Sequence, residues 1–163
     1  MRTTVKNVHE KFTRRENEVR LFIMNEIVSS GKMFDLDQER FSILRELGMS
    51  EQEYREICET LIKKDGMVTD GSKVQFIYPV SALETKHRVI LADGREFTAM
   101  CAIDAIGAAF TFHQDTEIHS TCARCGEPVH IEIKDGKLSQ YTPKNVHALS
   151  FELGEFENWA GSC

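Results

Sequence analysis

The chain has 163 residues, of which 26 are Asp or Glu and 20 are Lys or Arg, so its formal net charge is -6. This length suits one domain or two small ones, and an apolar share of 41% is enough to bury a core. The negative charge argues against binding to nucleic acid or to an anionic membrane. No apolar run approaches the roughly 20 residues that cross a bilayer, and the first ten residues lack the apolar core of a secretory signal. We therefore expect a cytoplasmic protein with neither a nucleic-acid nor a membrane partner.

Residues 1–80 are predicted to form three helices followed by a hairpin. Apolar spacing predicts a helix from Glu16 that ends at Gly31, and a second helix over residues 37–47. The third helix begins at Ser50, where Ser-Glu-Gln-Glu is a capping box. A hairpin that turns at Asp70-Gly71 would then complete a winged-helix-like unit.

A winged helix raises the possibility of DNA binding through the third helix. Basic side chains supply most of the affinity for a duplex, whereas this helix is mainly acidic. Its acidic positions are Glu51, Glu53, Glu56 and Glu59. This charge favours a structural role for the unit, packed against the next domain, and leaves a winged-helix regulator as a further alternative.

Residues 81–163 are predicted to form a second domain, reached through a linker over residues 80–84. Asp93-Gly94 and Asp135-Gly136 each mark a tight hairpin turn, and apolar residues alternate from Val129 to Ile133. A last strand is expected over residues 146–153. Together with a helix that follows Cys101, these strands predict a small, mostly antiparallel sheet with a helix packed on it, so the fold class is α+β.

The five cysteines are an odd set for a chain without an export signal, so free thiols or metal ligands are expected rather than disulfides. Cys58 lies among apolar helix positions and is expected to be a small buried residue. The four cysteines left as candidates for chemistry are Cys101, Cys122, Cys125 and Cys163.

Cys101 and Asp104 form the first chemical signal. A strand that runs into a helix places Cys101 at the helix N-terminus, where free N–H groups and the helix dipole favour a thiolate. Asp104, three residues later, would lie on the same helix face. The alternative is structural, because cysteine is commonly buried and aspartate is favourable in a first helical turn.

The segment Met100-Cys101-Ala102-Ile103-Asp104-Ala105-Ile106, preceded by Asp93-Gly94-Arg95-Glu96-Phe97, resembles the active-site segment of the organomercurial (alkylmercury) lyases. The resemblance extends to the N-terminal helical region and to residues 121–129. It implies a lyase of mercury detoxification that cleaves carbon–mercury bonds by protonolysis to a hydrocarbon and Hg(II). Cys101 would be the thiolate ligand and nucleophile, and Asp104 the proton donor and a further mercury ligand.

The resemblance also implies partners and a second cysteine. No cofactor is required, since Hg(II) is the bound product, which cellular thiols or a mercuric reductase would remove. Lyases of this family pair the helix cysteine with one far downstream, and Cys163 falls at a comparable place as the third catalytic residue. Two features depart from the family pattern: Cys163 is the last residue, and Met100 stands where an aromatic residue is common. A terminal cysteine without function stays an alternative.

Cys122 and Cys125 form the second chemical signal, because Cys-x-x-Cys-Gly is the spacing of a zinc knuckle or a redox pair. A closed zinc site would need two more ligands, from His119, His130 or Cys163. Structural, metal-binding, mercury-relaying and redox roles all stay open. We expect the histidines at 113, 119, 130 and 147 to be ordinary hydrogen-bonded residues.

These four cysteines also support a competing function. A protein of lyase-like fold could bind or sense a soft metal through them without cleaving any bond.

Overall fold

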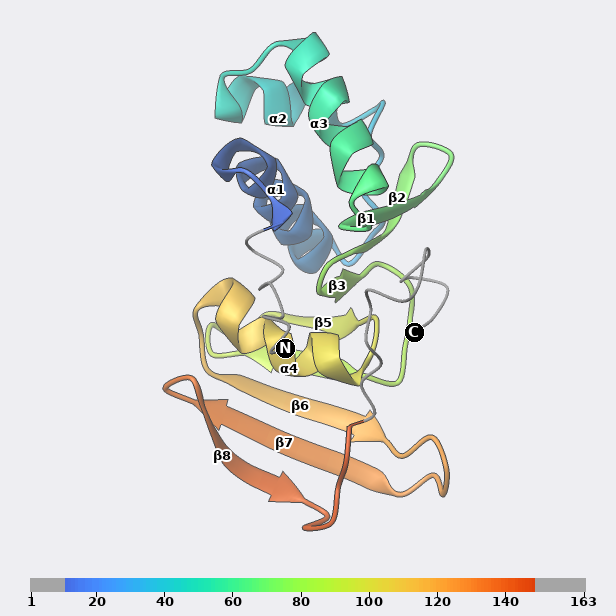
Figure 1. The fold of residues 1–163 in the computed structure, drawn as a ribbon, viewed down its shortest axis with the longest axis vertical. Helices are drawn as coiled ribbons and strands as arrows, with labels where there is room; N and C mark the ends of the chain where they lie inside the picture. The colour runs from blue at the N-terminus through green and yellow to red at the C-terminus, as the bar shows by residue number, and fades with distance from the viewer. Residues whose placement is uncertain (1–10, 149–163) are drawn as a thin grey trace, which may run out of the picture.

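The computed structural model describes residues 11–148, which form four helices and eight strands (Figure 1). The helices are α1 (Arg14–Ser30), α2 (Arg40–Leu47), α3 (Glu51–Lys63) and α4 (Ala102–Phe112). The strands are β1 (Met67–Asp70), β2 (Lys73–Ile77), β3 (Val80–Ser81), β4 (Arg88–Leu91), β5 (Glu96–Ala99), β6 (Thr116–Thr121), β7 (Pro128–Lys134) and β8 (Lys137–Thr142). The predicted α+β class is confirmed. None of the described helices is long and apolar enough to span a membrane.

All eight strands belong to one sheet in the order β1-β2-β3-β5-β4-β6-β7-β8, and every neighbouring pair is antiparallel. The short β3 joins the two halves of the chain, because Val80 pairs with Ile77 on one side and with Ala99 on the other. The prediction of a linker over residues 80–84 is therefore wrong for its first two residues. The winged-helix description and the domain boundary at residue 80 stay predictions.

Side chains cap the N-termini of two helices of the first half, α1 and α3. Thr13 and Glu16 form a complete capping box at the start of α1, and Gly31 ends that helix with a φ of 66°. The Ser50 side chain accepts the backbone N–H of Glu53 at 3.1 Å, as the capping pattern of α3 predicts. The second helix was predicted too long, because Asp35 Oδ1 accepts the N–H groups of residues 37 and 38 and holds them in a turn.

One hydrophobic core extends through both halves of the molecule. Cys58 is buried there, as expected, and its burial raises the pKa of the thiol to about 11. Three acidic residues of α3 face solvent: Glu51, Glu56 and Glu59. Their exposure agrees with the predicted acidic surface of this helix.

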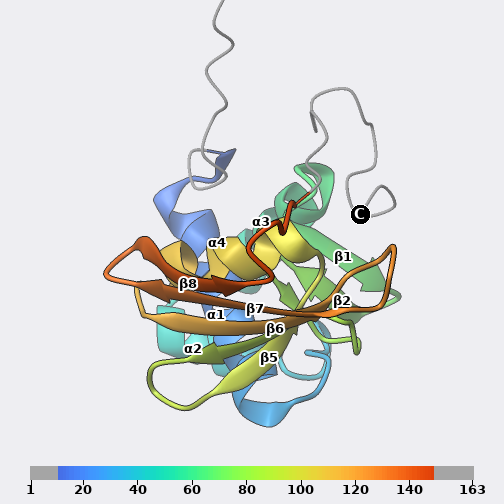
Figure 2. The same ribbon diagram turned by 90° about the horizontal axis from the view of Figure 1, so that it is seen from below.

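The three hairpins turn at the predicted Asp-Gly pairs, where each glycine has a positive φ: Gly71, Gly94 and Gly136. The helix α4 contacts β4, β5 and β6, and Figure 2 shows it on one face of this part of the sheet. The strand predicted over residues 146–153 is wrong for residues 146–148, which form no strand, and the rest of it lies outside the described residues.

Candidate active site

Cys101 lies at the point where β5 passes into α4. The strand ends at Ala99, and Cys101 is the extended N-cap residue of the helix, with a φ of -144° and a ψ of 178°. Its carbonyl accepts the backbone N–H of Ala105 at 3.0 Å. The partly buried thiol makes no capping hydrogen bond and donates instead to Asp104 Oδ2 at 3.3 Å. The predicted position of Cys101 and its proximity to Asp104 are therefore observed.

Asp104 is a buried carboxyl in the first turn of α4, with only 4% of the residue exposed. Burial raises its pKa to about 6, although hydrogen bonds from Cys101 act in the opposite direction. Protonated and ionised forms of this carboxyl are therefore both accessible near neutral pH. Such a group can take a proton from a thiol and later donate it.

Tyr78, the residue that follows β2, lies close to this pair and to α4. A Cβ atom added to Gly107, one turn after Asp104, would lie 3.0 Å from the Tyr78 hydroxyl oxygen. Burial and the neighbouring negative charge of Asp104 raise the pKa of Tyr78 to about 12, so its hydroxyl stays neutral.

Arg20 of α1 supports Tyr78 from the first half of the chain. The residue has no exposed surface, and its Nη1 donates to the Tyr78 carbonyl oxygen at 2.6 Å. Burial lowers the pKa of the guanidinium to about 10, so it stays charged at neutral pH. The buried cation of Arg20 therefore holds the backbone of Tyr78, whose hydroxyl lies close to α4.

Sequence reasoning missed both Tyr78 and Arg20. A signal existed for Arg20, because it shares the buried stripe of α1 with Met24 and Ile27, where an unpaired charge would be costly. Its position therefore indicates a polar partner in the core. No comparable signal marks Tyr78, because its role depends on the approach of its side chain to Gly107 of α4, which lies in the other half of the chain.

The Cys122–Cys125 turn connects β6 to β7, and both thiols are free. Backbone N–H groups of Cys125 and Arg124 donate to the Cys122 sulfur and lower its pKa. The exposed Cys125 thiol is a further donor to the same sulfur. The turn thus stabilises a thiolate at Cys122, as a metal-binding or redox turn would.

This turn lies at the same end of the sheet as Cys101. His87 connects the two strand ends, since its carbonyl accepts the N–H of Ala99 at 2.8 Å and its Nδ1 lies 2.7 Å from Ser120 Oγ. Ala99 precedes Cys101 by two residues, and Ser120 precedes Cys122 by two.

The structure brings His119 and His130 together with Glu117, not with the two cysteines. Within residues 11–148, no group of three close metal-ligating side chains includes Cys122 or Cys125. A closed zinc site at that turn therefore lacks two ligands among the described residues. His113 ends α4, and His147 is exposed in a loop. Cys163 lies outside the described residues, so its pairing with Cys101 stays a prediction.

Comparison with known proteins decides the family. The family model of MerB, alkylmercury lyase, matches residues 80–162, just over half of the chain, including Cys101 and Asp104. The chain belongs to the alkylmercury lyase family. The resemblance seen in the sequence is therefore confirmed. No curated protein matches the chain.

The fold is also similar to that of a solved structure described as the mercury-bound form of MerB2, with a TM-score of 0.65 and 23% identity. The match covers 83% of this chain and 63% of that protein, so the present chain spans under two thirds of its length. Since 83% exceeds the share that the family model matches, the likeness in fold includes much of the helical first half.

Proposed function

We propose that this alkylmercury lyase family member cleaves the carbon–mercury bond of organomercurials by protonolysis, giving a hydrocarbon and thiol-bound Hg(II). The observation that carries this proposal is the hydrogen bond of 3.3 Å from the Cys101 thiol to the buried Asp104 carboxyl. A soft sulfur ligand and a proton carrier thus share one helical turn, inside the segment that the family model matches.

In the first step, the Cys101 sulfur bonds to the mercury of the substrate. Thiolates are the preferred ligands of soft metals. As the sulfur–mercury bond forms, the S–H bond breaks and the proton passes to the Asp104 carboxylate, while the ligand that mercury carried leaves as an anion. A pKa near 6 makes this carboxylate a better proton acceptor than an exposed aspartate.

In the second step, another thiolate adds to mercury and raises the electron density on the bonded carbon. Family resemblance makes Cys163 the proposed source of that thiolate. Asp104 then donates its proton to the carbon, the electron pair of the carbon–mercury bond becomes the new C–H bond, and Hg(II) stays on the two sulfurs. Cellular thiols in the cytoplasm, or a mercuric reductase, would remove it.

Tyr78 and Arg20 would act as positioning residues. The neutral Tyr78 hydroxyl lies against Gly107 and contributes to the burial around Asp104 without supplying a competing charge. Arg20 fixes the Tyr78 backbone through its carbonyl.

The test is to incubate the full chain with a phenylmercury salt and excess thiol, and to measure benzene. Benzene should form with the parent protein and not with Cys101→Ser, whereas Cys58→Ser, which changes a buried cysteine away from the site, is the control. Absence of benzene with the folded parent, or its continued release by Cys101→Ser, would reject the proposed reaction.

The second candidate function is a soft-metal binder that cleaves nothing. The exposed Cys122–Cys125 turn, with its stabilised Cys122 thiolate, is the observation that favours it. In that case the protein should retain Hg(II) through Cys101, Cys122, Cys125 and Cys163 and release no hydrocarbon.

A further inference from the structure

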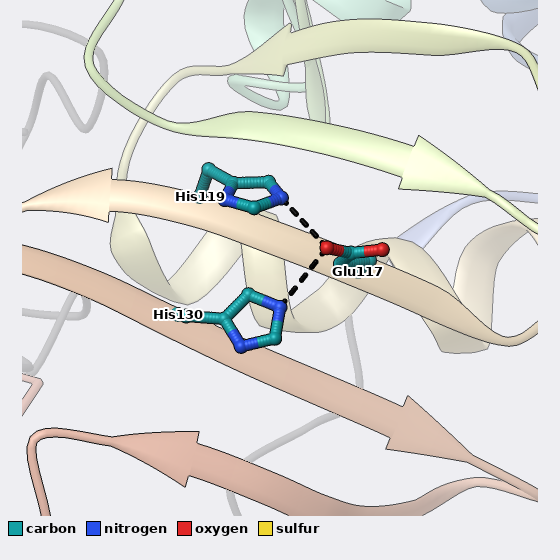
Figure 3. Close-up of side chains that lie close together, drawn as sticks. All are labelled: Glu117, His119 and His130. Carbon is teal, nitrogen blue, oxygen red and sulfur yellow. Dashed lines mark hydrogen bonds and ion pairs between the residues drawn. The ribbon is translucent and has the colours of Figure 1, made fainter.

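Two neighbouring strands carry a cluster of imidazole and carboxylate groups on the face of the sheet opposite to α4. Glu117 and His119 alternate with the buried Ile118 on β6, so they point away from the core. His130 of β7 is the direct cross-strand partner of His119. Figure 3 shows the three side chains pointing toward one another.

The three side chains converge on one carboxylate oxygen. Glu117 Oε1 lies 2.8 Å from His119 Nε2 and 3.1 Å from His130 Nε2. The two rings are 4.9 Å apart between centroids, and one ligating atom from each of the three residues lies within 4.8 Å of the others. These hydrogen bonds, first from His130 and then from His119, lower the pKa of Glu117 and favour its charged form.

We propose that Glu117, His119 and His130 bind a divalent transition-metal cation of the Zn²⁺ class. Zinc lies about 2.0–2.2 Å from nitrogen and oxygen ligands, which places neighbouring ligand atoms of a tetrahedron roughly 3.3 Å apart. The two pairs that share Glu117 Oε1 are already at 2.8 and 3.1 Å, so small side-chain rotations would admit the ion. Two imidazoles and one carboxylate leave a fourth position for water.

The ligand chemistry separates this site from the thiol chemistry of the proposed lyase. Nitrogen and oxygen ligands suit Zn²⁺, Cu²⁺ or Ni²⁺, whereas a soft metal such as mercury prefers sulfur. The cluster also lies on the opposite face of the sheet from α4, which carries Asp104. The metal site is therefore independent of the lyase reaction, and either can fail without the other.

The hairpin provides a prepared frame for these ligands. Six successive residue pairs join β6 to β7, and the turn is closed by the N–H of Cys122, which donates to the Glu127 carbonyl at 2.9 Å. Because this register fixes His119 opposite His130, the ion would cross-link two strands that are already paired. Because the ion would bind the folded state and not the unfolded chain, it would raise the temperature of unfolding.

The test measures Zn²⁺ binding by calorimetry in the full chain with its four other candidate thiol ligands replaced: Cys101→Ser, Cys122→Ser, Cys125→Ser and Cys163→Ser. One equivalent of Zn²⁺ should bind. His119→Ala, His130→Ala and Glu117→Gln should each weaken the affinity by roughly tenfold or more, since each removes one ligand or its charge. His147→Ala, which removes an exposed histidine elsewhere, should not change it.

A second readout uses the parent chain, so the proposal stays testable if the four-serine variant does not fold. Cobalt bound by this cluster should give visible absorption bands without the sulfur-to-cobalt charge transfer that thiolate ligands produce. His119→Ala should remove these visible bands. Zn²⁺ should also raise the unfolding temperature of the parent more than that of Glu117→Gln. The site would be overturned if Zn²⁺ bound with equal affinity to the four-serine protein and to its three ligand variants, or if no saturable Zn²⁺ binding were found at all.

Discussion

Two aspartates of this chain show how the surroundings of a carboxyl set its chemistry. Asp93, at a hairpin turn, accepts hydrogen bonds from Arg95 and Gln114, which hold its pKa well below the usual range. Asp104 is buried beside a thiol, and burial raises its pKa to about 6. The first can serve only as a fixed anion, whereas the second can exchange a proton near neutral pH.

Changing each member of the proposed catalytic pair should separate mercury binding from bond cleavage. Asp104→Asn keeps the shape and the sulfur but removes the proton carrier, so hydrocarbon release should fall by about 10²- to 10⁴-fold while Hg(II) is still bound. Cys101→Ser should lose both properties, because a hydroxyl is a hard ligand with a high pKa. Benzene release and Hg(II) retention after dialysis measure the two effects. If Asp104→Asn cleaved at the parent rate, Asp104 would be a structural residue.

The raised pKa of Asp104 also predicts a pH dependence of stability. Between the unfolded pKa of about 4 and the folded pKa of about 6, the native state holds a proton that the unfolded chain has released. The free energy of unfolding should therefore gain roughly 2–3 kcal/mol from this residue as pH falls from 7 to 4.

Urea unfolding of the parent and of Asp104→Asn at several pH values isolates this contribution, because other groups titrate equally in both proteins. Asp104→Asn should lack the gain in free energy of unfolding that the parent shows as pH falls from 7 to 4. Parallel pH profiles for the two proteins would show that Asp104 keeps an ordinary pKa.

At the scale of elements, α4 is shaped by a close approach to Tyr78. A glycine inside a helix is less favourable than alanine by about 0.5–1 kcal/mol. At Gly107 an added Cβ would meet the Tyr78 hydroxyl at 3.0 Å, which is tighter than an ordinary contact. Gly107 therefore lets the helix and this tyrosine pack together next to Asp104.

A double-mutant cycle tests this contact. Gly107→Ala should destabilise the parent or leave it unimproved, because the tyrosine must move. In a Tyr78→Phe background the same change should stabilise the protein by about 0.5–1 kcal/mol, since the hydroxyl is gone and the helix propensity remains. Unfolding free energies in urea measure all four proteins. An identical effect of Gly107→Ala in both backgrounds would exclude the contact as its cause.

Local sequence signals predicted the elements that local interactions determine. The Asp-Gly turns and the Ser50 cap depend on a few neighbouring residues, and they are found where expected. The two-residue β3 is too short to show strand alternation, so only its pairing with β2 and β5 identifies it. The spacing of Cys101 and Asp104 was likewise readable, whereas the contact of Tyr78 with α4 depends on tertiary packing.

At the scale of the whole molecule, one sheet and one core connect the helical first half to the proposed site. The pairing of β3 crosses between the halves, and so does the close approach of the Tyr78 hydroxyl to Gly107 of α4. Arg20 holds the backbone of Tyr78 from within the first half. The family model begins at residue 80, yet Arg20 and Tyr78 precede it. The first half therefore contributes to the surroundings of Asp104 even though the chemistry is proposed for the second.

The second thiolate of the reaction is a question about the whole chain, because Cys163 follows the last described residue, Ala148, by fifteen positions. Such a segment can span about 50 Å when extended, so its length allows Cys163 to reach Cys101. Cys163→Ala should therefore reduce benzene release far more than Cys125→Ala, which removes the exposed thiol of the β6–β7 turn. Both variants should still bind one Hg(II) through Cys101. The reverse ranking would transfer the second-ligand role to the Cys122–Cys125 turn, which lies at the same end of the sheet as Cys101 and holds a stabilised thiolate.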